Sequence, residues 1–402
     1  MDSRFCSVCV VGLGYIGLPT ASMLGTKGYD VTGVDVSPKV VETINKGEIH
    51  IVEPDLDLLV KSAVNAGKLK ASLEPVKADV YIIAVPTPFK DNYVPDLSYV
   101  EQASRAIAPF IEKGNLVILE STSPVGTTDG SVAAILTETG LKVGEDVFVA
   151  HCPERVLPGR ILIELIQNDR IVGGINKKST SIASDFYREF VSGNVLETDA
   201  KTAELSKLTE NSFRDVNIAF ANELSLICDK ENIDVWELIS LANRHPRVDI
   251  LQPGPGVGGH CIAVDPWFII DRAPEESRLI KQARLVNDAK PDWVISKIVE
   301  KASKFKKPTI SIMGLAFKAN VDDLRESPSV EIAQKLVNLN IGDVLVCEPN
   351  IKEHSIFDLT SLDEAVSRAD ILVVLVDHSE FKSLSAAKLS EKIIIDTRGI
   401  IK

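Results

Sequence analysis

The sequence lacks the features that would assign it to a membrane, metal-binding or nucleic-acid-binding class. No apolar run approaches the ~20 residues that a membrane-spanning helix requires. The six histidines and six cysteines show no spacing typical of metal ligands, so we expect no bound metal. The net charge of −13 argues against nucleic acid and against an anionic membrane as general partners, since both bind a basic surface.

The cysteines are few and scattered, which is typical of a protein with reduced thiols. Residues 1–4 lead directly into an apolar run and leave no room for a signal peptide, so we expect a cytoplasmic location. Cys6 and Cys9 form a lone C-x-x-C pair on the expected first strand. Their side chains should point to opposite faces of that strand, and we expect both to pack in the core.

Alternating β-rich and helical patterns predict the fold. The 402 residues are 45% hydrophobic and 25% charged, which suits two or three ordinary globular domains of ~150 residues each. Five nearly continuous apolar runs occur early in the chain, at residues 7–12, 30–36, 79–87, 116–122 and 146–152. Helical patterns such as 99–111 separate them. Strands buried on both faces and separated by helices predict a doubly wound parallel sheet.

A helical segment and a second set of strands follow. Residues 203–230 keep helical periodicity without proline or glycine, which predicts one long helix. Apolar runs resume at residues 309–317, 343–349, 371–378 and 392–399. The sequence therefore predicts an α/β fold with two Rossmann-like, doubly wound parallel-sheet domains, 1–200 and 306–402, joined by a helical domain, 201–305, with a long central helix.

A glycine-rich turn after the first strand predicts a dinucleotide site. Gly12, Gly14 and Gly17 are in G-x-G-x-x-G register, which permits a tight turn, close approach of a pyrophosphate, and close packing of helix on strand. Asp35 lies about 20 residues further on, where an acid binds the ribose hydroxyls. A 2′-phosphate beside Asp35 would cost on the order of 4 kcal/mol at ~4 Å and an effective dielectric of ~20, so we predict NAD rather than NADP.

Other residues near the ends of these strands are cofactor candidates. Tyr15 and Ile16 lie inside the glycine turn, and Thr87 and Thr122 follow two strands at their carboxyl ends. Ligands of open parallel sheets bind at such ends. Ordinary loop capping is the alternative for both threonines.

One face of the long helix carries polar residues. Lys207, Asn211 and Arg214 follow i, i+4, i+7 spacing and therefore share that face. A solvated polar face is one reading of the pattern. A face toward a cleft is the other, in which the lysine stabilises an alkoxide or acts as a base.

The segment GPGVGGHCIAVDPW, residues 254–267, combines bare backbone with a thiol. Gly256, Gly258 and Gly259 allow tight coiling around a ligand and present Cys261, with Asp265 four residues later. A thiolate adds to an aldehyde, the resulting hemithioacetal loses hydride to NAD, and the thioester that remains is hydrolysed to a carboxylate. A buried, inert cysteine is the alternative.

These motifs, in this order, resemble the UDP-glucose/GDP-mannose dehydrogenase family over essentially the whole chain. GLGYIG resembles its cofactor turn, KLTEN its K-x-x-x-N helix, GPGVGGHCIAVDP its catalytic-cysteine loop, and GLAFKANVDDLRESPS the opening of its C-terminal domain. The resemblance implies an NAD-dependent, four-electron oxidation of a nucleotide sugar at C6. An alcohol becomes an aldehyde and then a carboxylate, with two NAD used per turnover.

The resemblance also implies roles for particular residues. The catalytic set would be Cys261 as nucleophile, Lys207 as catalytic lysine, Asn211 as hydrogen-bonding asparagine, Asp265 as loop aspartate, and Glu154 in acid–base work or water activation. Members acting on UDP-glucose often have a second glutamate where this chain has Pro158. Mechanisms that use two glutamates are therefore not expected to transfer intact.

Departures from the family pattern indicate the substrate. The family usually reads G-G-S-C-x-P-K-D, whereas this chain has His260, Ala263 and Val264. These three residues and the segments NSFRDVNIAFANELS and NRHPRV resemble one branch of the family. That branch oxidises UDP-N-acetyl-D-mannosamine to UDP-N-acetyl-D-mannosaminuronate for surface polysaccharides. That branch implies sugar-nucleotide contacts from Arg155, Val156, Lys207, Asn211, Arg214, His245, Arg247, Gly258, Phe317 and Lys318. Arg325 would contact NAD, and Arg398 is either a substrate ligand or part of a surface salt bridge.

Three alternatives remain at this point. UDP-N-acetylglucosamine is the first, although its branch tends to read HCIPIDP around the cysteine. A β-hydroxyacid dehydrogenase of the 6-phosphogluconate type needs neither Cys261 nor a second α/β domain. A non-catalytic NAD-binding scaffold would not need Cys261, Lys207 and Asn211 together. The long helix offers an apolar face to a second copy, and the resemblance implies at least a homodimer.

Overall fold

The computed structural model describes residues 5–157, 159–384 and 386–401, and the chain divides into two compact units. The first unit is Met1–Glu210 with Trp267–Arg272, and the second is Asn211–Pro266 with Ala273–Lys402. No helix within the described residues is long and apolar enough to cross a membrane.

The first unit contains an eight-stranded sheet with strand order β3-β2-β1-β4-β5-β6-β7-β8. Its strands are β1 (Ser7–Val11), β2 (Asp30–Val34), β3 (Leu69–Ser72), β4 (Val80–Ile83), β5 (Leu116–Leu119), β6 (Phe148–His151), β7 (Arg170–Gly174) and β8 (Val195–Asp199). Neighbours pair in parallel except β6 and β7, which are antiparallel. The order of the first six strands is that of a dinucleotide-binding sheet, so the doubly wound prediction is confirmed.

The sequence does not predict β3, β7 and β8. β3 and β8 are edge strands with part-exposed, polar sequences, LKAS and VLETD, and so lack a continuous apolar run.

Both faces of this sheet are buried. Val8 and Val10 of β1 belong to one apolar cluster, whereas Cys9 and Val11 belong to another, as alternation along a strand requires. Burial raises the pKa of the Cys9 thiol to about 11. Cys6 is exposed, so the expectation that it packs in the core is wrong: it precedes β1, and the strand's burial does not extend to it.

Helices flank the strands of the first unit. They are α1 (Gly17–Thr26), α2 (Pro38–Asn45), α3 (Leu56–Asn65), α4 (Ser98–Ile107), α5 (Ala133–Thr137), α6 (Ile161–Gln167) and α7 (Lys177–Arg188), with short turns η1 (Asp91–Tyr93), η2 (Ala108–Phe110) and η3 (Thr127–Val132). Helix α4 confirms the helical prediction for residues 99–111 over most of its length.

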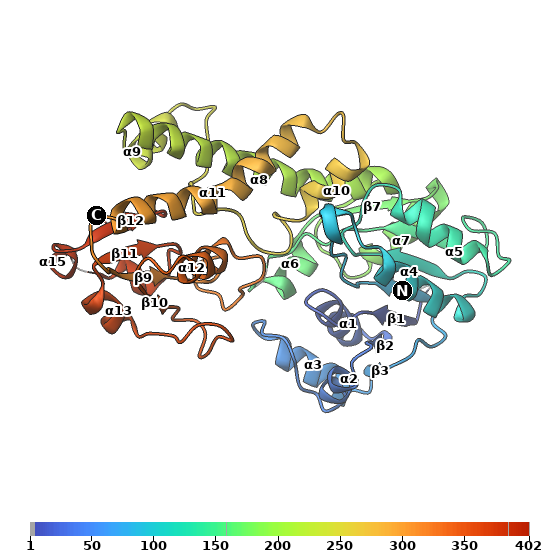
Figure 1. Cartoon of the computed structure of the whole chain (residues 1–402). Helices are drawn as coiled ribbons and strands as arrows, with labels where there is room; N and C mark the ends of the chain where they lie inside the picture. Colours follow the sequence, from blue (N-terminus) through green and yellow to red (C-terminus); the bar gives the residue numbers. More distant parts are fainter. Residues whose placement is uncertain (1–4, 158, 385, 402) are drawn as a thin grey trace. The chain divides into compact units, whose positions relative to one another are not determined.

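The predicted long helix is α8 (Ala200–Glu231), which runs unbroken through 32 residues (Figure 1). It is followed by α9 (Val235–Ala242), α10 (Asp265–Arg272) and α11 (Arg278–Ala302). Side chains of α8 and α11 pair in register: Arg284 binds Asp215, and Asn222 donates to Asn287. Because residue numbers rise together along both helices, these stretches run parallel, held by buried polar contacts.

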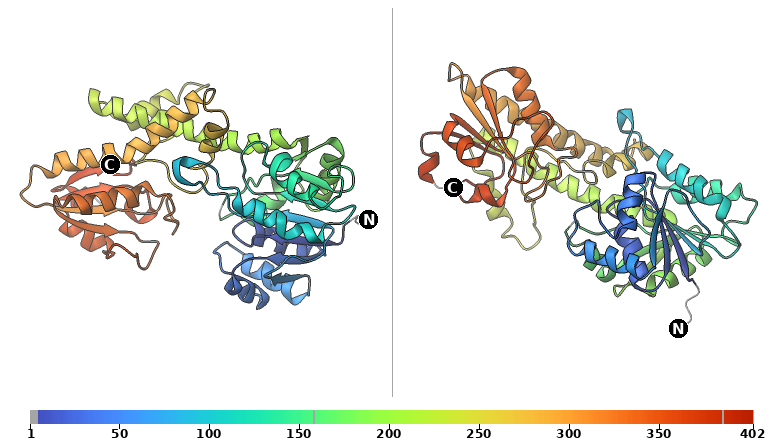
Figure 2. Two further views of the ribbon diagram at one scale, coloured as in Figure 1. Left: turned by 45° about the vertical axis from the view of Figure 1, so that its right-hand side comes forward. Right: turned by 90° about the horizontal axis from the view of Figure 1, so that it is seen from below.

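The second unit contains a parallel four-stranded sheet with strand order β10-β9-β11-β12. Its strands are β9 (Thr309–Met313), β10 (Asp343–Cys347), β11 (Ile371–Val374) and β12 (Ile393–Asp396), and its further helices are α12 (Pro328–Leu339), α13 (Leu362–Arg368), α14 (Ser379–Lys382) and α15 (Ala386–Leu389). In Figure 2 the orange-to-red strands lie side by side with helices against them. The second α/β prediction is confirmed.

Candidate active site

The glycine turn between β1 and α1 requires glycine at two positions. Gly12 has φ +94°, and a Cβ built on it would lie 2.6 Å from the carbonyl oxygen of Ala84. A Cβ on Gly17 would overlap the carbonyl oxygen of Gly12, so only glycine lets the helix begin this close to the strand. Gly14 has open space at its Cα, which leaves the backbone accessible to a pyrophosphate.

Asp35 follows β2, and backbone amides hold its carboxylate. Oδ2 accepts a hydrogen bond from the amide of Leu13 at 3.1 Å, and Oδ1 accepts one from the amide of Ser37 at 2.9 Å. Because Leu13 lies inside the glycine turn, this bond ties the acid to the turn. Tyr15 is 38% exposed and Ile16 is half-buried, and both lie in the same turn.

Thr87 and Thr122 come together beyond the ends of β4 and β5. The Thr87 hydroxyl donates to the carbonyl oxygen of Thr122 at 2.6 Å. Glu204 of α8 holds the loop that follows: its carboxylate accepts from the amide of Gly126 at 2.6 Å and from the amide and hydroxyl of Thr128 at 2.8 and 2.7 Å. Burial raises the pKa of Glu204. Sequence reasoning missed it, because nothing local separates it from a surface glutamate on a helix.

Glu154 follows β6 and is buried in an ion pair. Its Oε2 lies 2.9 Å from Nη1 of Arg170, whose side chain is 2% exposed. Its Oε1 accepts from the amide of Arg155 at 2.6 Å. Both carboxylate oxygens of Glu154 therefore accept hydrogen bonds. Arg170, like Glu204, is a residue of the site that the sequence did not indicate. Pro158 lies outside the described residues.

Arg170 also influences two neighbouring acids. Burial raises the pKa of Glu120 to about 7 and that of Cys152 to about 12, and in both cases the Arg170 guanidinium opposes the rise. The hydroxyl of Tyr187 donates to Oε1 of Glu120 at 2.7 Å. Glu120, Cys152 and Tyr187 thus form a buried polar cluster around Arg170, the ion-pair partner of Glu154.

Arg155 and Val156 continue the chain beyond Glu154. The Arg155 guanidinium lies 2.8 Å from a carboxylate oxygen of Glu210 and donates to the carbonyl oxygen of Asp169 at 3.1 Å. Val156 is half-buried. Arg155 is therefore tied to α8 at the residue that precedes Asn211.

The polar face of α8 divides between half-buried and exposed residues. Lys207 and Asn211 are half-buried, whereas Arg214 is exposed. Nδ2 of Asn211 donates to Oδ2 of Asp265 at 2.5 Å. Because Asp265 is only 4% exposed, this bond satisfies part of a buried carboxylate.

Cys261 is half-buried and lies in the turn that leads into α10. Its carbonyl oxygen accepts from the amides of Val264 at 3.0 Å and Asp265 at 2.8 Å. Gly256 and Gly259 have φ values of +148° and +83°, a region that favours glycine. The cysteine is therefore presented by a tightly wound loop and is only partly buried.

The glycines of this loop also let it approach the segment after β9. A Cβ on Gly258 would lie 2.5 Å from the carbonyl oxygen of Glu326, and one on Gly259 would lie 3.0 Å from the ring of Phe317. The amide of Gly259 donates to the carbonyl oxygen of Arg325 at 3.1 Å. The structure thus brings the cysteine loop together with Phe317 and Arg325, which the sequence analysis proposed as ligand contacts.

The side chains of Lys318, Arg325, His245 and Arg247 lie on exposed parts of the second unit. Lys318 is exposed, and Arg325 directs its guanidinium at Asp323, with Nη2 2.6 Å from Oδ2. His245 and Arg247 are exposed in the turn after α9, where Nδ1 of His245 accepts from the amide of Arg247 at 3.3 Å. These two residues therefore contact each other within that turn.

Arg398 follows β12 and takes part in a salt bridge. Its Nη2 lies 2.9 Å from Oδ1 of Asp377, the alternative that the sequence analysis left open. A Cβ on Gly254 would lie 2.6 Å from Nη1 of Arg398, so the same guanidinium also reaches the start of the cysteine loop.

Comparison with known proteins matches the whole architecture to one family. Residues 6–191 match the NAD binding domain of the UDP-glucose/GDP-mannose dehydrogenase family, 201–289 its central domain, and 311–402 its UDP binding domain. The chain belongs to the UDP-glucose/GDP-mannose dehydrogenase family. It is an NAD-dependent UDP-sugar dehydrogenase, as the motifs predicted.

Individual relatives of this dehydrogenase cover almost its full length. It is 57% identical to an NDP-N-acetyl-D-galactosaminuronic acid dehydrogenase of Ralstonia nicotianae, over 100% of this chain and 97% of the relative. It is 53% identical to the UDP-N-acetyl-D-mannosamine dehydrogenase of Escherichia coli K12, over 98% and 99%. The solved structure of the UDP-N-acetyl-mannosamine dehydrogenase Cap5O from Staphylococcus aureus has a TM-score of 0.91, with 44% identity over 98% of this chain and 96% of that one.

The residues of the dehydrogenase fit the cofactor. The space that a side chain would fill at Gly12 and Gly17 is taken by backbone, and Gly14 is left open, as a bound pyrophosphate requires. The Asp35 carboxylate is already oriented at the turn by two amides. The backbone of the turn thus fixes the position of that acid.

Proposed function

We propose that this dehydrogenase oxidises UDP-N-acetyl-D-mannosamine at C6 to UDP-N-acetyl-D-mannosaminuronate, for surface polysaccharide synthesis. The observation that carries the proposal is the half-buried Cys261 on its tightly wound glycine loop, four residues before an aspartate that binds Asn211. The Ala263-Val264 pair and the similarity to dehydrogenases named for this substrate support the choice of sugar.

The first oxidation converts the C6 alcohol to an aldehyde. We assign to Lys207 either acceptance of the hydroxyl proton or stabilisation of the alkoxide by its charge. Asn211 lies one turn along α8, and its bond to Asp265 fixes the orientation of the amide. NAD, when bound, supplies the hydride acceptor for both oxidations.

The second oxidation uses the thiol. The Cys261 thiolate forms a C–S bond to the aldehyde carbon, and the hemithioacetal is oxidised to a thioester. Water then attacks the thioester carbon, the C–S bond breaks, and the thiol is restored as the carboxylate leaves. One alcohol, one water and two NAD thus give one carboxylate, two NADH and three protons.

We assign Glu154 to activation or orientation of that water. The ion pair with Arg170 fixes the position of this carboxyl group. Since both oxygens already accept hydrogen bonds, Glu154 would act through the oxygen lone pairs that remain.

Ligand contacts complete the assignment. For NAD we propose Gly12, Gly14, Tyr15, Ile16, Gly17, Asp35, Thr87, Thr122 and Arg325. For the UDP-sugar we propose Arg155, Val156, Lys207, Asn211, Arg214, His245, Arg247, Gly258, Phe317, Lys318 and Arg398. NAD binding falls to residues 1–200, the catalytic lysine helix and cysteine loop to 201–305, and UDP-sugar binding to 306–402.

We further propose that the enzyme is a homodimer or a larger homo-oligomer in the cytoplasm. Phe213, Phe220 and Ile227 recur every seven residues on α8 and are 71%, 51% and 50% exposed. Large apolar side chains exposed in a row are typical of a surface that a second copy covers.

A second candidate substrate is the corresponding N-acetylgalactosamine nucleotide, favoured by the 57% identity to the Ralstonia nicotianae dehydrogenase. UDP-N-acetylglucosamine is the third. The deciding experiment incubates the enzyme and NAD with each UDP-sugar in turn, follows NADH absorbance and identifies the product by mass. We expect two NADH per sugar and a uronate from the mannosamine nucleotide. One NADH per sugar, or preference for another epimer, would contradict the proposal.

A further inference from the structure

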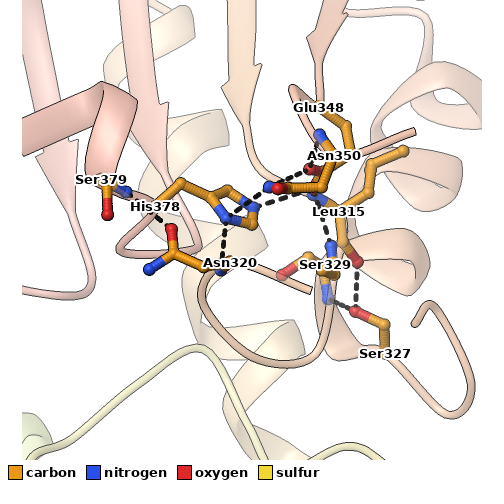
Figure 3. Close-up of polar contacts among 9 residues, drawn as sticks. Leu315, Asn320, Ser327, Ser329, Glu348, Asn350, His378 and Ser379 are labelled. Atoms are coloured by element: carbon orange, nitrogen blue, oxygen red, sulfur yellow. Dashed lines mark hydrogen bonds and ion pairs between the residues drawn. The ribbon is translucent and has the colours of Figure 1, made fainter. Parts of the chain in front are cut away.

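A buried acid–imidazole pair lies in the second unit, among residues to which the proposed function gives no role. Nε2 of His378 lies 3.0 Å from Oε2 of Glu348, and Figure 3 shows the pair with its partners. His378 is 0% exposed and Glu348 is 4% exposed. Glu348 follows β10 and His378 comes shortly after β11, so the pair lies beyond the carboxyl ends of these two strands, which are the two neighbours of β9.

The pair holds both ends of one loop. Oε2 of Glu348 accepts from the amides of Leu315 at 2.7 Å and Ala316 at 3.0 Å, at the beginning of the loop. Nδ1 of His378 accepts from the amide of Asn320 at 2.9 Å, at its end. Asn320 has φ +59°, so this amide is held in a strained turn.

The hydrogen bonds define the state of both side chains. Because Nδ1 of His378 accepts a backbone amide, the ring proton lies on Nε2 and is donated to Glu348. Burial would raise the pKa of Glu348, but hydrogen bonds from His378, Leu315 and Asn350 outweigh it and lower the pKa to about 2. The acid is thus a charged acceptor built into the sheet end.

The loop between these anchors carries two proposed substrate contacts. Phe317 and Lys318 lie between Ala316 and Asn320, and Phe317 packs against Gly258 and Gly259 of the cysteine loop. Any shift of the loop therefore changes both the position of the Lys318 ammonium and the surface on which the cysteine loop rests.

We propose that Glu348 and His378 are positioning residues that hold residues 315–320 in the conformation that binds the diphosphate of UDP. The pair is buried and acts through the loop, with Lys318 as the group that meets the phosphates. This inference rests on the proposed function, from which it takes the UDP-binding role of Phe317 and Lys318.

Two substitutions separate the contact at Nε2 of the ring from those at Nδ1, which also lies 3.0 Å from Nδ2 of Asn350. Glutamine at His378 can keep a donor to Glu348 but offers no acceptor where Nδ1 meets Asn320, whereas asparagine can keep that acceptor and loses the donor. Removing the ring acceptor of the Asn320 amide should release this end of the loop and weaken UDP binding by about tenfold in His378→Gln. His378→Asn should bind UDP more tightly than His378→Gln.

The measurements are calorimetric Kd values for UDP alone and for NAD, with KM and kcat for the sugar nucleotide, on full-length protein below its unfolding transition. We expect the UDP Kd and KM to rise while the NAD Kd stays unchanged. His354→Gln is the matched control, because Nδ1 of His354 also accepts backbone amides, from Ile356 and Phe357, in a segment without a proposed contact.

Equal UDP affinity in wild type and folded His378→Gln would overturn the positioning role and leave the proposed function standing. Absence of UDP binding by the wild type would instead overturn the proposed function, and this inference with it. Glu348→Gln provides a second route if His378→Gln does not fold: it should also weaken UDP binding, and an unchanged UDP Kd would count against the proposal.

Discussion

Replacing Arg284 by methionine should destabilise the second unit by about 3–5 kcal/mol at neutral pH. Nη1 of Arg284 lies 2.6 Å from Oδ1 of Asp215, and their side chains are 2% and 0% exposed. Asn287 also donates to that oxygen, at 2.8 Å. Methionine fills a similar volume but leaves the carboxylate buried with a neutral partner only, which is the costly way to break such a pair.

The cost should depend on pH. Burial already raises the pKa of Asp215, and the Arg284 guanidinium opposes that rise. Without the guanidinium the folded-state pKa rises further, so the folded variant takes up a proton more readily than the unfolded chain. Its stability is therefore lost as pH rises through the folded pKa, by at most about 1.4 kcal/mol per pH unit, and is partly recovered as pH falls toward the unfolded value.

Urea unfolding followed by tryptophan fluorescence measures this effect, because Trp236 and Trp293 both belong to the second unit. The matched control combines Arg284→Met with Asp215→Asn, which removes the buried charge and should recover roughly 2 kcal/mol of the loss. A single variant that loses less than about 1 kcal/mol, or a double variant no more stable than the single one, would refute the reasoning.

Three further predictions concern the reaction and the cofactor. Cys261→Ala should abolish acid formation, because no thioester can form. Uronate detected by mass spectrometry would reject Cys261 as the nucleophile. Cys228→Ala, at a buried cysteine outside the site, is the control and should leave the product unchanged. Lys207→Ala should lower kcat by about 10²–10⁴-fold, because acid–base or charge assistance is lost. Lys230→Ala, on the same helix, is the control and should leave kcat unchanged. A steady-state rate of Lys207→Ala equal to that of the wild type would limit Lys207 to a structural role. Asp35→Ser should raise the ratio of kcat/KM for NADP to kcat/KM for NAD by up to roughly a thousandfold, because it removes ~4 kcal/mol of repulsion between the carboxylate and the 2′-phosphate. An unaltered ratio would mean that Asp35 does not select the cofactor.

Local patterns were sufficient to predict much of the fold. The periodicity of residues 203–230 predicted α8, and the spacing of Gly12, Gly14 and Gly17 predicted a turn in which steric contact leaves room only for glycine at the first and third of these positions. These features follow from short stretches of chain, since helical hydrogen bonds and tight turns join residues close in sequence. The order of motifs likewise predicted the family.

Pairing between distant residues was decided by tertiary structure. Glu154, which follows β6, pairs with Arg170 of β7, and Glu348 meets a histidine 30 residues away. In the sequence each of these is one more polar residue beside an apolar run, with no sign of whether it faces water or the interior. Burial makes an unpaired charge costly, so such residues persist inside only where the fold brings their partners to them. Local sequence can therefore predict which motifs carry the reactive residues. Only the tertiary structure determines which buried groups hold those motifs in position.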